Sequence, residues 1–422
     1  MTKKNKLNKN QIIDIVFFAI LVGVMSVFLW RLVIAQTIYS EIDGGYRSDI
    51  LAYMQEMQGI DSGYNFPYPL FFSFGSFLNR FFSIDIAIAI AEVSLNALAL
   101  FAAKYYFDKR LFSDDKFPDK WYVRIIVSLV VMACFLLSMW WLPRFGRIKL
   151  PHKDQVYIGT YTGNPWHNAT YIATRPFAIV AFFSFIELLK TYEKKIEIKD
   201  VIVFSVSLFL TTITKPSFTF VLVSSAGLVM AFRLIRSKFK NIKNSLLAAC
   251  CFVPTFVALL FQFSNVFGSR GIAAQNGEHG IGFTFFAVWR NYTPHVIEAI
   301  VYANAFALVG ILIFIKDIKK DVMYRFTLFM FLVSVLEAGL LCEKGYRFKD
   351  FNFSWGYMHG IFFFEMVTAI MLLRATFTKS KKWFLLVIAW GLFLIHLVAG
   401  VLYFKGVFYG LDYGTLLPDS WI

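Results

Sequence analysis

Charged side chains are scarce in this sequence. Asp, Glu, Lys and Arg together make up 16% of its 422 residues, whereas hydrophobic residues make up 58% and the mean hydropathy is +0.61. A water-soluble chain of this length needs a polar surface that so few charges could not supply. The composition therefore argues against an ordinary soluble protein and indicates a membrane protein.

Cysteine is also rare, and its positions argue against a disulfide framework. Cys134, Cys250 and Cys251 lie within apolar segments, and Cys342 is the only other cysteine. The sequence has neither a Cys-x-x-Cys pair nor a Cys/His spacing typical of a metal site, and no Gly-rich loop precedes a helix in a polar segment. No cofactor is therefore expected, and a divalent metal bound by carboxylates is the open alternative.

Long apolar runs follow one another almost from end to end, and most could cross or nearly cross a bilayer of about 30 Å. They predict an all-α polytopic membrane protein with about eleven transmembrane helices, organised as one domain over residues 1–422. The expected spans are 12–35, 84–107, 125–142, 177–189, 201–213, 218–235, 246–263, 299–315, 326–341, 357–373 and 383–404.

The basic residues predict the orientation of these spans. Alternate connections hold 27 of the 42 Lys and Arg residues, and basic residues near span ends are retained on the cytoplasmic side. The N-terminus is therefore expected in the cytoplasm and the C-terminus outside, in a multi-pass protein of the cell membrane. The net charge of +15 then reflects topology and attraction to anionic membrane lipids, so no nucleic-acid partner is expected.

The connections on the expected outer side are longer and richer in aromatic residues, which places function there. The first of them, residues 36–83, has two parts. Ser48 is a candidate N-cap for a short helix in which Ile50, Leu51, Met54 and Met57 recur at helical spacing, as expected for a helix in the membrane interface. After Pro67 and Pro69, the apolar segment 70–82 is expected to lie along the outer leaflet.

An acidic residue just outside the first span, followed by two juxtamembrane helices, resembles the GT-C class of membrane glycosyltransferases. The run from Phe66 to Leu70 resembles bacterial members. The resemblance implies a GT-C-like core over residues 12–235, variable transmembrane helices over 246–404, and a catalytic base at Asp49 or Asp43, with Asp49 preferred. The alternative is that either aspartate only caps a helix N-terminus, where the helix dipole favours negative charge.

A Thr-Lys-Pro turn between two short spans resembles a turn found in polyprenyl-phosphate-sugar transferases. Pro216 breaks the helix beside Lys215, which the topology places on the outer side. Lys215 is therefore a candidate for binding a lipid phosphate. An ordinary lysine that snorkels to the interface is the equal alternative.

Two other outer segments supply further candidate residues. In the second outer loop, His167, Asn168 and Arg175 could bind a phosphate leaving group, beside the interfacial Trp166. Anchoring to lipid headgroups is the simpler explanation. In the last third of the chain, Arg347 could join the phosphate site and Trp355, like Trp166, could stack on a sugar, although an interfacial aromatic belt predicts the same tryptophans.

These candidates favour a transferase that takes a sugar from a polyprenyl-phosphate-linked donor and passes it, with inversion, to an extracytoplasmic cell-envelope glycan or related lipid-linked acceptor. Asp49 would be the general base, and cationic side chains would stabilise the departing phosphate. Two alternatives remain open. One is a polymerase or ligase of lipid-linked glycans, and the other is a transporter or flippase of lipid-linked glycans, for which paired broken spans are typical.

Overall fold

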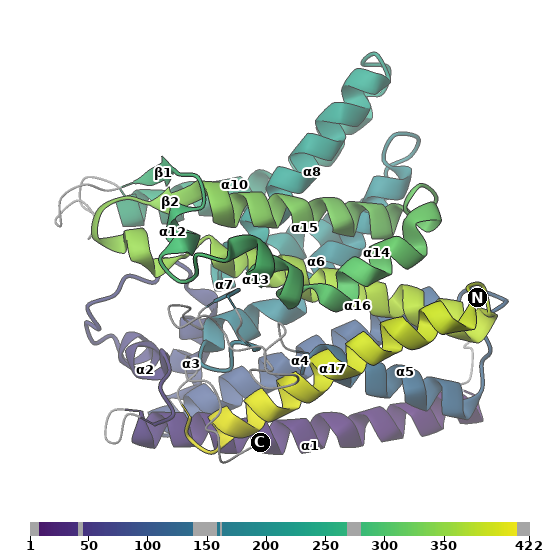
Figure 1. The fold of residues 1–422 in the computed structure, drawn as a ribbon. Coiled ribbons are helices and arrows are strands. Elements are labelled where there is room, and N and C mark those ends of the chain that lie inside the picture. The colour runs from purple at the N-terminus through teal and green to yellow at the C-terminus, as the bar shows by residue number, and fades with distance from the viewer. Residues whose placement is uncertain (1–7, 41–44, 138–157, 161–162, 268–279, 412–422) are drawn as a thin grey trace, which may run out of the picture.

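The structure is a computed structural model, and it describes residues 8–40, 45–137, 158–160, 163–267 and 280–411. Asp43, one of the two candidate bases, lies outside the described residues. The described chain is almost entirely helical (Figure 1).

The helices are α1 (Lys9–Tyr39), α2 (Ile50–Gln58), α3 (Leu70–Leu78), α4 (Ile84–Leu111), α5 (Trp121–Cys134), α6 (Ala169–Thr191), α7 (Ile198–Thr214), α8 (Ser217–Arg236), α9 (Ile242–Cys250), α10 (Val253–Phe267), α12 (Ala287–Arg290), α13 (Val296–Ala303), α14 (Ala305–Ile318), α15 (Val322–Leu340), α16 (Ser354–Thr378) and α17 (Trp383–Phe408). A 3₁₀ helix, η1, covers Gly345–Asp350. Strands β1 (Ile281–Phe283) and β2 (Leu341–Glu343) pair antiparallel, with Gly282 opposite Cys342.

The expected all-α polytopic class is confirmed, but the expected count of eleven spans is not. Among the described residues, seven helices are long and apolar enough to cross a membrane, and counting two bent pairs as one span each raises this number to nine. The bends are 50° between α9 and α10 and 71° between α13 and α14. The two remaining expected spans correspond to α5 and α7, which have only 14 and 17 residues.

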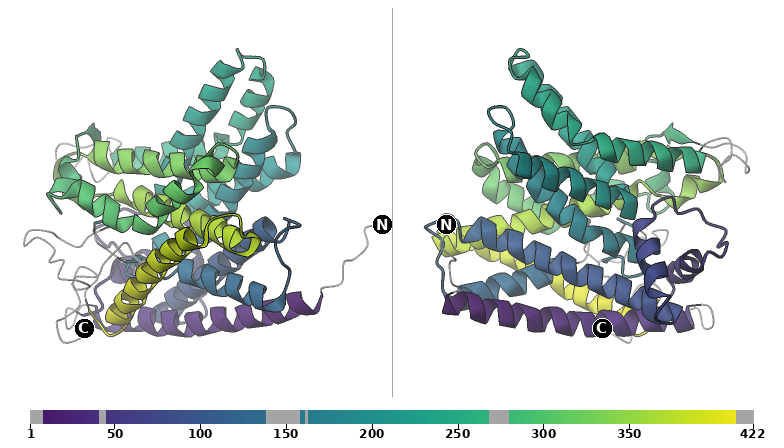
Figure 2. Two further views of the ribbon diagram at one scale, coloured as in Figure 1. Left: turned by 45° about the vertical axis from the view of Figure 1, so that its right-hand side comes forward. Right: turned by 180° about the vertical axis from the view of Figure 1, so that it is seen from behind.

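The helices form a bundle with α6 and α16 in its interior. Figure 1 shows α1 along one side of the bundle and α10 and α15 along the opposite side. Most side chains of α6 and α16 are buried, whereas α1, α8 and α17 have smaller buried shares and expose many apolar side chains, as expected for helices that face lipid. The connection between α8 and α9 projects beyond the rest of the bundle in both Figure 1 and Figure 2.

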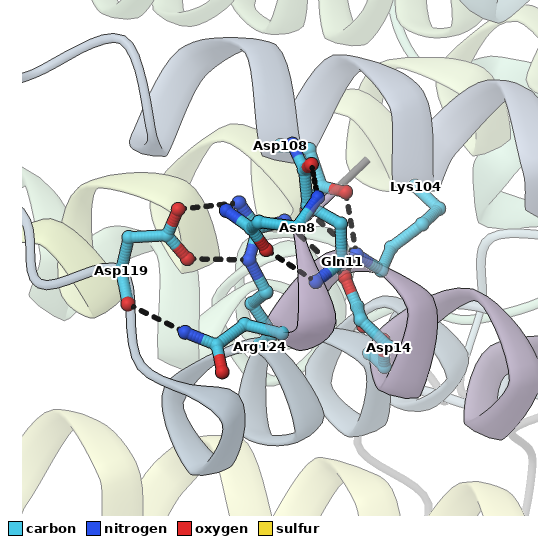
Figure 3. A network of polar contacts seen from close by, with 9 residues as sticks. Asn8, Gln11, Asp14, Lys104, Asp108, Asp119 and Arg124 are labelled. Carbon is cyan, nitrogen blue, oxygen red and sulfur yellow. Dashed lines mark hydrogen bonds and ion pairs between the residues drawn. The ribbon is translucent and has the colours of Figure 1, made fainter. Parts of the chain in front are cut away.

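One end of the bundle is held together by buried charges (Figure 3). Asp14 on α1 accepts hydrogen bonds of 2.6 Å from Lys104 on α4 and from Ser128 on α5. Arg124 on α5 lies 3.5 Å from the Asp14 carboxylate and donates to Asp119 in the α4–α5 connection. Because all of these charges have partners, the network joins three helices at the N-terminal end of α1.

The short helices α2 and α3 lie at the opposite end of α1 (Figure 2, right). Their positions in the chain match the two juxtamembrane helices expected between the first two spans. Helices α6, α8 and α16 also begin at this end, because Asn168, Lys215 and Trp355, at or near their first residues, contact one another and the start of α2. The candidate residues of four different segments are therefore brought together here.

Candidate functional site

The break between α7 and α8 directs Lys215 into the bundle. Pro216 has no backbone N–H, so the carbonyl of Thr212, four residues earlier, lacks its helical partner. The side chain of Gln262 on α10 replaces that partner, because its Nε2 donates to the Thr212 carbonyl at 2.8 Å. Lys215 itself has extended backbone angles, with φ −166° and ψ 121°, and its side chain is buried.

The ammonium of Lys215 is held by neutral groups. It donates to Oδ1 of Asn168 at 3.2 Å and to Oγ1 of Thr170 at 3.1 Å, and it lies 4.5 Å from the ring centroid of Trp355. Among the described residues, no carboxylate forms a direct ion pair with it. Burial lowers the pKa of Lys215 to about 8, while the charge of Asp49 acts in the opposite direction.

Asp49 occupies the N-cap position of α2 but does not cap the helix. Its side chain forms no capping hydrogen bond in the described part of the chain. Its Oδ2 instead accepts from Nδ2 of Asn168 at 2.6 Å and from the hydroxyl of Tyr53 at 3.3 Å. The prediction that Ser48 would be the N-cap is therefore wrong by one residue, although Ser48 Oγ does accept from the N–H of Ile50 at 3.4 Å.

The backbone joins the first loop to the start of α6 as well. The N–H of Asp49 donates to the carbonyl of His167 at 3.1 Å. Asn168, the next residue, caps α6, since its Oδ1 accepts from the N–H of Tyr171 at 2.9 Å. Asp49, Asn168 and Lys215 therefore form one connected cluster, which we call the Asp49 cluster.

Two tyrosines that sequence reasoning missed belong to the Asp49 cluster. The hydroxyl of Tyr53 accepts from Nδ2 of Asn168 at 2.9 Å and lies 3.3 Å from Oγ1 of Thr170. The ring of Tyr68 lies 5.9 Å from the Lys215 ammonium. Burial, followed by the charge of Asp49, raises the pKa of both phenols, so both stay protonated and can donate. Tyr53 could have been found from the sequence, because it lies one helical turn after Asp49. Tyr68 could have been found too, because it belongs to the Phe66–Leu70 run.

The two candidate stacking tryptophans have other contacts. Trp355 is buried, and the Lys215 ammonium lies over its ring, while the ring of His167 lies 5.9 Å away from it. Trp166 is buried against Phe404, with ring centroids 5.0 Å apart. Trp355 therefore packs against Lys215 at the border of the Asp49 cluster, whereas Trp166 lies inside the bundle.

Arg175 lies two helical turns after Asn168 along α6 and does not join the Asp49 cluster. It is buried, and its Nη2 donates to Oδ1 of Asn164. Its guanidinium lies 5.1 Å from the ring of Tyr171 and 5.2 Å from that of Phe362. No hydrogen bond connects it with Asp49, so the two cations expected at one phosphate site lie in different surroundings. Asn164, Tyr171 and Phe362 also line a small cavity that Glu365 borders.

Arg347 lies at the edge of the Asp49 cluster. On η1 it pairs with Glu343 at 3.1 Å and with Asp350 at 3.3 Å. Its charge also reaches Tyr68, where it opposes the effects that raise the pKa of that phenol. Its acidic partners already neutralise Arg347 in part, so its link with the Asp49 cluster is an electrostatic effect on Tyr68 and not a hydrogen bond.

The Asp49 cluster combines a half-buried carboxylate, a buried ammonium and two phenolic donors at one end of a helical membrane bundle. Such a set can accept a proton on one side and stabilise an anion on the other. Within the described ranges, no group of three or more His, Cys, Asp or Glu side chains could hold a metal ion. No known protein-family model and no curated protein matches the chain.

Proposed function

We propose that this protein is a membrane glycosyltransferase that uses a polyprenyl-phosphate-linked sugar and an extracytoplasmic glycan or lipid-linked acceptor. One observation carries the proposal. The Asp49 carboxylate is not used for capping and is held, through Asn168, beside the only charged group of the cluster that could bind a phosphate directly, the ammonium of Lys215. A base and a phosphate-binding cation on either side of one amide suit sugar transfer from a phosphate.

In this mechanism Asp49 is the general base. Its Oδ2 is occupied by Asn168 and Tyr53, whereas Oδ1 accepts no hydrogen bond from any described residue and can take a proton. As the acceptor hydroxyl attacks the anomeric carbon, its proton passes to Oδ1, the new glycosidic bond forms, and the bond between the anomeric carbon and the phosphate oxygen breaks. Attack from the face opposite the phosphate inverts the anomeric centre.

The leaving group is polyprenyl phosphate, on whose oxygens negative charge builds. Lys215 is placed to stabilise that charge because its surroundings are buried and contain no competing carboxylate in direct contact. Arg347 acts electrostatically on Tyr68, and the ring of His167 lies 5.9 Å from that of Trp355, so both are further candidates for contacting the phosphate. The membrane itself would supply the donor, since a polyprenyl chain partitions into lipid.

The test is Asp49→Asn, which preserves shape and removes the proton acceptor. Transfer of radiolabelled hexose from polyprenyl-phosphate hexose into the envelope fraction should fall by about 10²–10⁴-fold, while donor binding persists. The matched control is Asp61→Asn, an exposed aspartate of the same loop, which should retain activity. Asp43→Asn should cost less than Asp49→Asn. Full activity in both the Asp49 and Asp43 variants would rule out the mechanism.

Transport of a lipid-linked glycan is the second candidate, and the bent pairs α9–α10 and α13–α14 favour it. Broken spans are typical of transporters, where they usually occur in corresponding halves. Both bends here lie in the second half of the chain, and the Asp49 cluster is built from the N-caps of α2 and α6 and from the α7–α8 break rather than from the bent pairs. Translocation of a fluorescent lipid-linked glycan across proteoliposomes, without any change in its covalent structure, would support transport instead of transfer.

A further inference from the structure

The side-chain amide of Asn168 has no hydrogen-bonding capacity left for a ligand. Its Nδ2 donates one proton to Asp49 and the other to the Tyr53 hydroxyl. Its Oδ1 accepts from the backbone N–H of Tyr171, from Oγ1 of Thr170 at 2.9 Å, and from Lys215. An amide offers two donors and one oxygen with two lone pairs, and three donors already share that oxygen, so neither a donor nor a lone pair remains.

The orientation of that amide is fixed by the helix it caps. The N–H of Tyr171 can only donate, so the atom of Asn168 that faces it must be the oxygen. The nitrogen must then face Asp49. The start of α6 therefore determines that the carboxylate meets a donor and that the ammonium of Lys215 meets an acceptor.

Asn168 also separates two opposite charges. The Asp49 carboxylate and the Lys215 ammonium bind opposite ends of the same amide, and no direct ion pair forms between them. Without the amide, the two side chains would attract each other in a buried site where that attraction is weakly screened. A direct pair would occupy the carboxylate that takes the proton and the ammonium that binds the phosphate.

We propose that Asn168 is a positioning residue that keeps Asp49 and Lys215 apart and individually available, rather than a ligand-binding residue. The inference rests on the proposed function for its effect on catalysis. Its structural part, the separation of the two charges, can be measured in the absence of any substrate. The groups that act on Lys215 are Asp49 at the N-cap of α2, Tyr68 before α3, Asn168 at the N-cap of α6, Thr170 from α6, and Trp355 and His359 from α16, while Tyr53 from α2 reaches it through Asn168.

The decisive variant is Asn168→Ser, because serine still caps α6 but is too short to reach both charges. Lysines of the purified full-length protein are dimethylated with ¹³C-formaldehyde, and their methyl signals are followed by NMR as a function of pH. The Lys215 signal is assigned by its loss in Lys215→Arg. In Asn168→Ser the pKa of Lys215 should rise by about one unit, since Asp49 can then pair with it directly. Asn164→Ser, an asparagine of the same loop that binds Arg175 instead, should leave the Lys215 signal unchanged.

The second arm measures hexose transfer from polyprenyl-phosphate hexose as a function of pH. In Asn168→Ser, kcat should fall by about 10- to 100-fold and the basic limb of the profile should move to higher pH, which a simple loss of folded protein would not produce. An unchanged Lys215 pKa overturns the proposal. A raised pKa with unchanged transfer also overturns it. If the wild-type protein transfers no hexose, the proposed function fails, while the NMR arm still decides whether Asn168 separates the charges.

Discussion

At the scale of single residues, hydrogen-bond partners separate the two buried cations that the sequence suggested for one site. Lys215 contacts Asn168, Thr170 and Trp355 within the Asp49 cluster. Arg175 meets Asn164 and several aromatic rings deeper in the bundle. A buried cation without a direct carboxylate partner is costly and usually has a functional role. This cost applies to both cations, and Lys215 is the more informative residue for binding experiments because it shares Asn168 with the Asp49 carboxylate.

The prediction at the scale of residues concerns the protonation of Lys215 and its effect on donor binding. In the proposed mechanism only the charged form would bind the phosphate, and this form exists below the pKa, which burial lowers to about 8. Donor affinity should therefore be constant below pH 7 and fall as pH rises through 8, as measured by binding of fluorescent polyprenyl-phosphate hexose. Lys215→Arg should remove this fall, because a guanidinium stays charged, yet bind less tightly than wild type at pH 7 since its fork does not fit the same contacts.

A control and a contradictory result complete this test. Lys349→Gln changes an exposed lysine of η1 and should leave the pH dependence intact. Wild-type affinity that stays level up to pH 10 would show that Lys215 does not contact the phosphate.

At the scale of secondary-structure elements, side chains from neighbouring helices satisfy the carbonyls freed where helices break. Gln262 on α10 does this at the α7–α8 break, where Thr212 has lost its partner to Pro216. Ser205 on α7 donates in the same way to the carbonyl of Cys251, at the bend between α9 and α10, at 2.8 Å. Each break is therefore stabilised from another element, so α7 and α10 depend on each other.

The element-scale prediction is that Gln262→Leu destabilises the protein and displaces Lys215. The variant leaves the Thr212 carbonyl buried without a donor, which typically costs about 1–3 kcal/mol. The midpoint of thermal unfolding in detergent should fall, and donor affinity should weaken. Ser264→Leu introduces the same side chain at an exposed position of α10 and should change neither. If the two variants have equal stability, Gln262 is not needed at the break.

At the scale of the whole molecule, the two ends of the bundle differ in chemistry. The end shown in Figure 3 carries paired charges, including Asp14, Lys104 and Arg124, and the α4–α5 connection there also carries Lys116 and Lys120. The other end carries the Asp49 cluster and the short helices α2 and α3. The positive-inside rule predicts that the first end faces the cytoplasm and the second faces outward.

Cysteine labelling tests that orientation. In a background without native cysteines, Ser62→Cys and Tyr346→Cys should react with a membrane-impermeant thiol reagent in intact cells. Asp115→Cys, Lys195→Cys and Lys240→Cys should react only after the cells are opened. All five positions lie in connections outside the long helices, and all but Ser62 are well exposed. Labelling at position 240 together with protection at 62 would invert the orientation and move the Asp49 cluster to the cytoplasmic side.

Local pattern in the sequence was enough to predict the helical class, the two short helices after α1 and the break at Pro216. These features depend on apolar runs and on proline geometry, which act over a few neighbouring residues. The count of eleven spans that the same reasoning gave is not confirmed, since seven to nine candidate spans are found in the part of the chain that the structure describes. That reasoning had no means to detect the bends at α9–α10 and α13–α14, because bends within apolar runs leave composition unchanged.

The candidate site, like the fold, could be predicted from the sequence only in part. Hydropathy and motif resemblance singled out Asp49, Asn168 and Lys215 separately, but whether Asp49 caps α2 could not be read from its position. The tertiary structure decided this, because the donors that occupy its Oδ2 include an amide 119 residues away in the chain. Likewise, only packing placed Lys215 over Trp355 and Arg175 away from both. Side-chain hydrogen bonds depend on which helix ends meet in space, and that is decided by the packing of the whole bundle rather than by local sequence.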